Sequence, residues 1–234
     1  MVEVKVIDKG RISYKNAWDF QTQLHNGLKE TKVENRDREE TDKIKQEHYF
    51  VICEHNPVYT LGKSGSEDHL LIDKEKRAKE HIEYFKINRG GDITFHGPGQ
   101  IVGYPILDMD EIFTDIHKYV RFLEEVIIRT CADYKIKCDR IEGYTGVWIK
   151  DGNTQRKICA IGVHLSRWVT MHGFAFNVNT DLDYFNYIIP CGIKEEGKEV
   201  TSLEKELGRR MDYEEVKEKV LFHFKEIFQV KLIG

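Results

Sequence analysis

The sequence predicts an α+β fold, in which helices flank a mixed β-sheet, and two kinds of pattern support this. Short alternating or β-branched runs bounded by glycine or proline recur along the chain and are typical of strands. Other segments, most clearly residues 115–134, carry apolar residues at helical spacing with charges opposite. No repeat or low-complexity linker interrupts the 234 residues, so we expect one α+β domain over residues 1–234.

The elements can be assigned in chain order from these patterns. We expect strands over residues 2–7, 48–54, 82–88, 92–96, 101–107, 146–150, 155–165 and 168–178, the sixth and seventh forming a hairpin. We expect helices over residues 14–29, 67–80, 115–134, 201–208 and from Asp212 onward. Residues 179–187 suggest a short helix or turn. Residues 30–47 are dominated by charge and are expected to form a solvated helix end or flexible loop.

Composition excludes several classes of function. The formal net charge is −4 and the pI about 6.2, so nothing suggests binding to nucleic acid or to an anionic membrane. No apolar run approaches the length of a transmembrane helix. The cysteines are odd in number and form no C-x-x-C pair, which disfavours a zinc site or a disulfide framework and favours a cytoplasmic location. We expect no metal and no cofactor.

The chain is organised around the glycine-rich segment Arg89–Gln100. Apolar strands are expected on both sides of it, and glycine lets a backbone approach a ligand closely with its N–H groups bare. Arg89 and His96 bracket the first loop as polar groups. The segment is therefore a candidate pocket wall, although two tight turns within a sheet explain the glycines equally well.

Cys191 differs from the other cysteines because it lies between Pro190 and Gly192, outside any periodic apolar element. A thiol in such a loop is accessible, as a nucleophile must be, but the cysteine can also be incidental. The histidines at positions 96, 164 and 172 are candidate partners for it, and each also fits a role as an ordinary hydrogen-bonded residue.

Lys157 is the second unusual residue. An alternating strand places it on the same face as Cys159, Ile161 and Val163. A lysine on such a face lies either at an exposed strand end or in a partly desolvated position. In the second case its pKa would fall, so it could act as a general base and favour a nearby thiolate.

Four motifs in chain order resemble the signatures of the lipoyl(octanoyl) transferase family. They are Arg-Gly-Gly-Asp-x-Thr-Phe-His-Gly-Pro-Gly-Gln at 89–100, Lys-Ile-x-Ala-Ile-Gly at 157–162, His-Gly-Phe-Ala-Phe-Asn-Val at 172–178 and Pro-Cys-Gly-Ile at 190–193, and the likeness extends upstream to residues 55–62. The sequence departs from the family at Cys159, where a small non-thiol residue is expected and a second thiol would come near the site. The charged segment 30–47 is also longer than the family needs.

The resemblance implies a biotin/lipoate ligase-like fold. It also implies transfer of an octanoyl group from acyl carrier protein to a lysine of lipoyl domains, in 2-oxoacid dehydrogenase subunits and in the glycine cleavage H protein. By similarity, Cys191 carries the acyl group as a thioester, and Lys157 lowers the thiol pKa and moves protons. Also by similarity, the substrate-binding residues are Arg89, Gly90, Gly91, Asp92, Ile93, Thr94, Phe95, His96, Ala160, Ile161, Gly162, Gly173, Phe174 and Ala175.

Three other functions remain open on sequence grounds. An ATP-dependent lipoate–protein ligase would share the fold, activate free lipoate as an adenylate and not need Cys191. A thioester hydrolase would pair Cys191 with His164 or His172 and release free acid. A non-catalytic binding module would leave Cys191 unreactive and buried.

Overall fold

The computed structural model describes residues 1–189 and 197–234. In that part of the chain a nine-stranded mixed sheet has the order β12-β1-β2-β6-β10-β9-β8-β7, with β11 beside β9, and a separate three-stranded sheet has the order β4-β3-β5. The large sheet contains β1 (Glu3–Ile12), β2 (His48–His55), β6 (Gln100–Ile106), β7 (Asp139–Ile141), β8 (Tyr144–Asp151), β9 (Thr154–Ser166), β10 (Val169–Asn177), β11 (Lys198–Val200) and β12 (Lys231–Ile233). The small sheet contains β3 (Val58–Leu61), β4 (Glu83–Lys86) and β5 (Ile93–His96).

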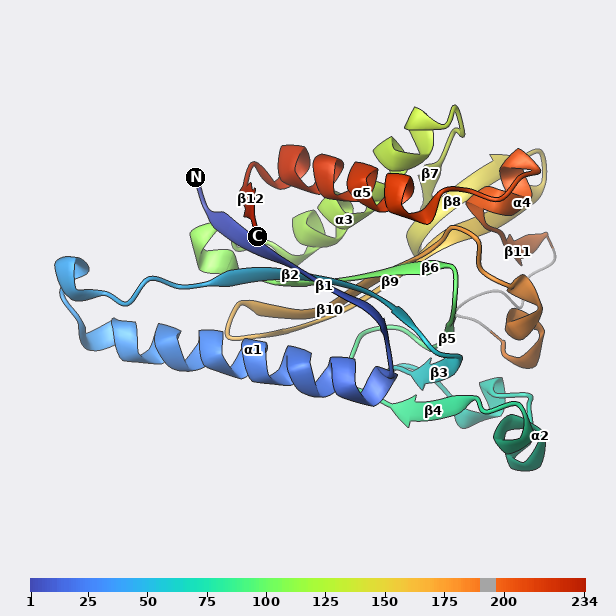
Figure 1. Cartoon of the computed structure of the whole chain (residues 1–234), viewed down its shortest axis with the longest axis horizontal. Helices are drawn as coiled ribbons and strands as arrows, with labels where there is room; N and C mark the ends of the chain where they lie inside the picture. Colours follow the sequence, from blue (N-terminus) through green and yellow to red (C-terminus); the bar gives the residue numbers. More distant parts are fainter. Residues whose placement is uncertain (190–196) are drawn as a thin grey trace.

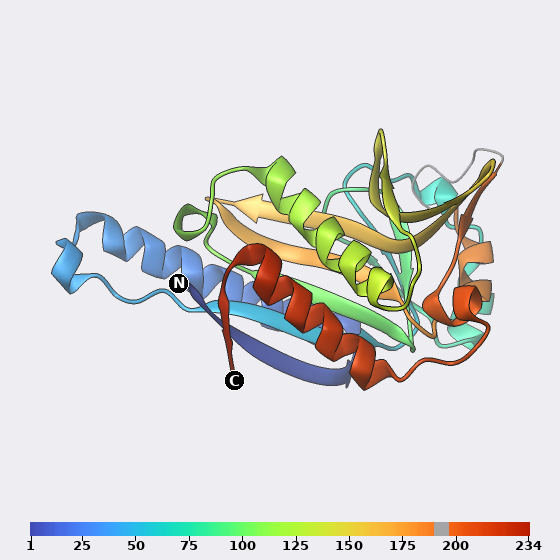
Figure 2. The ribbon, with the colours of Figure 1, turned by 90° about the horizontal axis from the view of Figure 1, so that it is seen from above.

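Helices cover both faces of the large sheet (Figures 1 and 2). The long helix α1 (Tyr14–Glu34) lies along one face, while α3 (Ile116–Asp133) and α5 (Tyr213–Phe228) lie side by side on the other. Successive residues of a strand face opposite layers, so Phe50 joins the core under α3 and α5 and Val51 the core under α1. The α+β prediction of a mixed sheet with flanking helices is confirmed.

The helix ends follow their capping residues. The hydroxyl of Ser13 accepts from the backbone N–H of Asn16, and the carboxylates of Asp115 and Asp212 cap α3 and α5 in the same way. The short helix α4 (Leu203–Leu207) ends at Gly208, which has φ of 66° in the left-handed region. The sequence predicted each of these helices.

Three predicted boundaries were wrong. Strand β1 continues to Ile12, five residues beyond the predicted end at position 7. Helix α1 continues to Glu34, five residues beyond the predicted end at position 29, so the first part of the charged segment is helical. The helix predicted over residues 67–80 is divided into the 3-10 helix η3 (Glu67–His69) and α2 (Lys74–Lys79). The residues between them are used elsewhere, because the Leu71 N–H donates to Tyr187 O and Asp73 starts α2 as its cap. Among the described residues, no helix is long and apolar enough to cross a membrane.

Candidate active site

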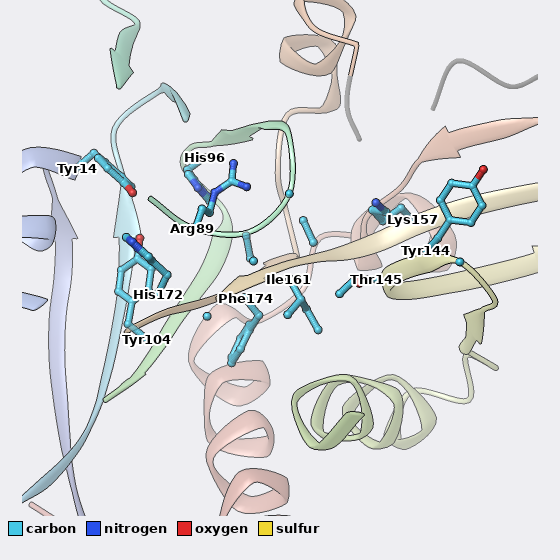
Figure 3. Close-up of a pocket in the computed structure, with 16 residues that line it drawn as sticks. Tyr14, Arg89, His96, Tyr104, Tyr144, Thr145, Lys157, Ile161, His172 and Phe174 are labelled. Carbon is cyan, nitrogen blue, oxygen red and sulfur yellow. The ribbon is translucent and has the colours of Figure 1, made fainter. Parts of the chain in front are cut away.

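A cavity of about 300 Å³ lies where the glycine-rich segment passes over β9 and β10 (Figure 3). It is lined by Tyr14, Arg89, Gly91, His96, Tyr104, Gly143, Tyr144, Thr145, Lys157, Ala160, Ile161, Gly162, His172, Gly173, Phe174 and Ala175. Lys157 and Tyr144 lie toward one end in this view, and Tyr14, Tyr104 and His172 toward the other. The labelled side chains thus lie along an elongated cavity, and the only lysine among the described residues that line it is at the end that also holds Tyr144.

The glycine-rich segment lies directly on β9, without side chains between them. The Gly90 N–H donates to Val163 O at 2.9 Å, and the Lys63 N–H donates to Arg89 O at 3.0 Å. A Cβ atom added at Gly162 would lie 2.7 Å from Gly90 O, closer than real Cβ atoms approach. The position therefore requires glycine because a backbone carbonyl occupies the space of a side chain.

Arg89 holds this segment in place from the inside. Its side chain donates through Nη2 to Thr60 O at 2.7 Å and to Thr60 Oγ1 at 3.0 Å, and through Nη1 to Gly90 O at 3.0 Å. The residue is buried. A guanidinium suits this position because its planar fork of donors reaches several acceptors at fixed angles.

His96 lines the cavity and packs against the buried His55, and burial is the main cause of the lowered pKa values of both rings. The pKa of His96 is held well below its usual range by burial, with smaller effects from His55 and Arg89. His55 has its pKa lowered to about 4, and its Nε2 lies 2.7 Å from the Tyr104 hydroxyl. Both rings are thus neutral hydrogen-bonding groups at neutral pH.

His172 has a backbone conformation that is uncommon for a non-glycine residue, with φ of 60° inside β10. Its backbone N–H donates to Gln21 Oε1 of α1 at 3.2 Å, and its Nε2 lies 3.1 Å from Asn88 Oδ1. Burial, followed by the charge of Arg89, lowers the pKa of His172 to about 3. The surrounding side chains therefore fix both the position and the neutral state of this ring.

Lys157 is only 8% exposed, so it is partly desolvated and not at an exposed strand end. Its face was predicted wrongly, however. In the pairing of β8 with β9, Val147 opposes Cys159 and Trp148 opposes Lys157, which leaves Ile158 as the extra residue of a β-bulge. Ile158 and Cys159 both enter the core under α3 and α5, whereas Lys157 lines the cavity.

The bulge also determines whether Cys159 places a second thiol in the cavity. Its thiol is fully buried in the core, its Sγ lies 3.5 Å from Ala160 O, and burial raises its pKa well above the usual value. The second thiol therefore lies near Lys157 but does not line the cavity, because the bulge turns this side chain into the core.

The structure brings most of the predicted substrate-binding residues around the cavity. Those that line it are Arg89, Gly91, His96, Ala160, Ile161, Gly162, Gly173, Phe174 and Ala175, together with the predicted catalytic Lys157. Gly90, Asp92, Ile93, Thr94 and Phe95 are not among the lining residues.

The positions of four of these residues explain why they do not line the cavity. Ile93 and Phe95 point into the small core around β3 and β5, where the Phe95 ring stacks on Tyr184. Thr94 pairs with Thr60 across the small sheet, and the Asp92 carboxylate contacts His69 Nδ1. These residues support the cavity wall from behind.

Four lining side chains were missed by sequence reasoning: Tyr14, Tyr104, Tyr144 and Thr145. Tyr14 falls in the helix predicted over residues 14–29 and Tyr104 in the strand predicted over residues 101–107, and nothing in their periodicity distinguishes them from core residues. The signal that the sequence offered near Tyr144 and Thr145 was Gly143, which forms a turn with φ of 79° directly before β8.

The predicted nucleophile Cys191 lies outside the described residues. The chain on either side of residues 190–196 is anchored: the Ile189 N–H donates to His69 O at 2.8 Å, and β11 pairs in parallel with β9 so that Val200 opposes Lys157. The described end at Ile189 thus lies on η3, and the other end, at Gly197, accepts from the Gln155 N–H at 2.7 Å, with Val200 three residues further on opposite Lys157. Over residues 1–189 and 197–234, no three or more His, Cys, Asp or Glu side chains gather to hold a metal ion.

Comparison with known proteins identifies the family of this chain. Residues 14–225 match the family model of the lipoyl protein ligase A/B catalytic domain. An octanoyltransferase of Christiangramia forsetii is 55% identical over 232 residues, covering 98% of this chain and 97% of the relative. An octanoyltransferase of Flavobacterium psychrophilum is 54% identical over 232 residues, covering 98% of each chain.

The fold agrees with these relatives. The bi-partite lipoate protein ligase of Thermoplasma acidophilum superposes with a TM-score of 0.65 at 15% identity, over 100% of this chain and 87% of that one. The chain belongs to the lipoyl protein ligase A/B catalytic domain family. The predicted family, its ligase-like fold and octanoyl transfer as its reaction are confirmed.

Proposed function

We propose that the chain moves an octanoyl group from acyl carrier protein, through a thioester on Cys191, to a lysine of lipoyl domains in 2-oxoacid dehydrogenase subunits and the glycine cleavage H protein. It acts in the cytoplasm as one catalytic domain over residues 1–234. The observation that carries the proposal is the buried amine of Lys157 in the wall of an elongated cavity. Curated octanoyltransferases that match nearly the whole chain support it.

The first step exchanges one thioester for another. The Cys191 thiolate attacks the carbonyl carbon of the carrier thioester, its bond to sulfur forms, and the bond to the carrier sulfur breaks. Lys157 takes the proton from Cys191 and passes it to the departing thiolate of the carrier. Because a bond of the same type is made and broken, the step is nearly balanced in energy and needs no ATP.

The second step forms the amide. The amine of the acceptor lysine attacks the acyl carbon, the C–N bond forms and the C–S bond to Cys191 breaks. Lys157 accepts the proton that the attacking amine loses and returns it to the Cys191 thiolate. An amide is more stable than a thioester, so this step is downhill and drives the sequence forward.

The cavity supplies the acyl site in this proposal. Ile161 and Phe174 provide apolar surface, and Ala160, Gly162, Gly173 and Ala175 keep the passage between them open. Arg89 keeps Gly90 against β9 and so closes the opposite wall. The buried neutral rings of His96 and His172 carry no charge that would oppose entry of an alkyl chain.

Mass spectrometry of the protein after incubation with octanoyl carrier protein tests the nucleophile. We expect one octanoyl adduct on the wild type and none on Cys191→Ser. The matched control is Cys159→Ala, which removes a thiol that is buried in the core and leaves the adduct in place. An unchanged adduct on Cys191→Ser would reject the role of Cys191.

A second comparison separates transfer from ligation. We expect lipoyl-domain modification with octanoyl carrier protein in the absence of ATP, and none with free octanoate or lipoate plus ATP. Modification that requires ATP and free acid would instead assign the chain to the lipoate–protein ligases. Release of free octanoate without modified lipoyl domain would indicate a thioester hydrolase.

A further inference from the structure

A line of buried polar side chains runs from the cavity wall to the backbone of Lys157. His96 Nδ1 lies 2.9 Å from Gln100 Oε1, and Gln100 Nε2 donates to Asn177 Oδ1 at 2.9 Å. Asn177 Nδ2 donates to Thr201 O at 2.9 Å, and the Thr201 N–H donates to Lys157 O at 2.9 Å. The proposed reaction assigns no role to the middle of this line.

Asn177 is the residue that joins the two halves. It lies at the end of β10, is 3% exposed, and uses both ends of its amide, one as acceptor and one as donor. A buried amide whose two ends are both bonded is held in a single orientation. Removing either the acceptor or the donor of the Asn177 amide would leave a buried polar atom of Gln100 or Thr201 without this hydrogen bond, which lowers the free energy of unfolding.

The Asn177 amide acts on the strand that borders Lys157. Val200 opposes Lys157 in the parallel pairing of β11 with β9, and Thr201 continues that pairing through its bond to Lys157 O. On the other side of Lys157, the extra residue Ile158 interrupts the regular pairing with β8. The pairing with β11 therefore has more influence on the backbone at Lys157 than it would in a regular ladder.

We propose that Asn177 is a positioning residue, which fixes Thr201 and through it the place and environment of the Lys157 amine. The proposal deepens the function given above and rests on it for the effect on turnover. Asn177 touches no reacting atom in this scheme. Its neighbour Thr201 is independently held by its hydroxyl, which donates to Glu206 Oε1 at 2.6 Å, so the fold survives a subtle change at Asn177.

The test variant is Asn177→Asp, which keeps the size and the acceptor for Gln100 but loses the donor to Thr201 O. The matched control is Asn179→Asp. Asn179 also holds a distant segment with both ends of its amide, but its partners are Met211 N and Met211 O, each at 2.9 Å. Both variants thus place the same carboxylate near the end of β10, and only one lies on the line to Lys157.

The first readout is the pH dependence of Lys157 acetylation by acetic anhydride, followed by peptide mass spectrometry. We expect the midpoint for Lys157 to move by about half a pH unit or more in Asn177→Asp, since a shifted amine changes its solvation and its charge partners. In Asn179→Asp we expect the wild-type midpoint. This measurement does not depend on any acyl transfer activity.

The second readout is steady-state transfer from octanoyl carrier protein. We expect kcat to fall about tenfold to hundredfold in Asn177→Asp, because displacement of a catalytic group by an ångström is enough to do so. We expect KM for the donor to stay near the wild-type value, and both constants to be unchanged in Asn179→Asp.

The outcomes distinguish the two proposals. An unmoved Lys157 midpoint in folded Asn177→Asp overturns the positioning role, even if activity falls. An equal shift in Asn179→Asp overturns it as well. A moved midpoint in a protein that never forms the Cys191 adduct leaves the positioning role standing and rejects the proposed function. If Asn177→Asp does not fold, Asn177→Ser is measured in its place, with the same expected shift, because its shorter side chain cannot bridge Gln100 and Thr201.

Discussion

The amino group of Lys157 lies 4.5 Å from the centroid of the Trp148 ring, over its face. The two residues are register partners in β8 and β9, and the bulge at Ile158 follows directly. Cross-strand partners share a face of the sheet, so the pairing and the bulge together direct the lysine toward the cavity and away from the core. The indole is fully buried and supplies a fixed surface against which the amine rests.

We predict a measurable coupling between these two side chains. The free energies of unfolding of Trp148→Leu, Lys157→Met and the double variant should give a coupling energy of about 0.5–2 kcal/mol, the range of partly desolvated cation–π contacts. Urea unfolding at neutral pH measures it, and the cycle cancels the cavity that the smaller leucine leaves. Additive effects within error would show that the contact contributes nothing to stability.

Gly162 should be required for the close packing of Gly90 against β9. We predict that Gly162→Ala destabilises the protein by about 1–3 kcal/mol, as forced overpacking does, because the new Cβ would meet Gly90 O at 2.7 Å and Arg89 Cδ at 3.0 Å. KM for the acyl donor should rise as the segment is displaced. Thermal unfolding and steady-state kinetics measure the two effects.

The control is Gly27→Ala in α1, where nothing lies within 4 Å of the added Cβ. This change should stabilise the protein by about 0.5–1 kcal/mol, since alanine is the better helix former. Equal behaviour of the two alanine variants would contradict the close approach at Gly162.

Arg89 should not be replaceable by lysine. A lysine has no planar fork, so Arg89→Lys cannot reach Thr60 and Gly90 together, and the buried acceptors lose their partners. We predict a loss of about 1–3 kcal/mol in the free energy of unfolding, the usual effect of breaking a buried charged hydrogen bond. Chemical denaturation measures it, with exposed Arg36→Lys as control; similar stability of both variants would be inconsistent with this role.

His55 should make stability depend on pH on the acid side. Its pKa is lowered from an ordinary 6.5 to about 4, mainly by burial, so the unfolded chain binds the proton first as the pH falls. The contribution of His55 to the free energy of unfolding is fully present above pH 6.5 and is lost progressively as the pH falls to about 4. Between pH 7 and pH 5 the loss from this one group is about 2 kcal/mol.

The measurement compares urea unfolding of the wild type and His55→Gln at those two pH values. Glutamine does not titrate, so the variant should lose about 2 kcal/mol less than the wild type over the same interval. Parallel pH dependence of the two proteins would show that His55 titrates normally in the folded state.

The sequence by itself determined the fold class, most elements and most of the residues that line the cavity. Helices α3 and α5 carry their apolar residues at helical spacing and their own capping aspartates, so local signals suffice for them. The glycine-rich segment was a candidate pocket wall on the evidence of its glycines, which allow a backbone to approach another backbone closely. These features depend on the residue and its immediate neighbours.

Only the tertiary structure decided which way Lys157 points and what lies opposite it. The alternation that placed it beside Cys159 fails at Ile158, because β8 and β11 impose different pairings on the two sides of β9. Tyr14 and Tyr104 reach the cavity from elements far apart in the chain. Strand periodicity is a local property, whereas a bulge and a shared cavity depend on which strands become neighbours, and no short stretch of sequence contains that information.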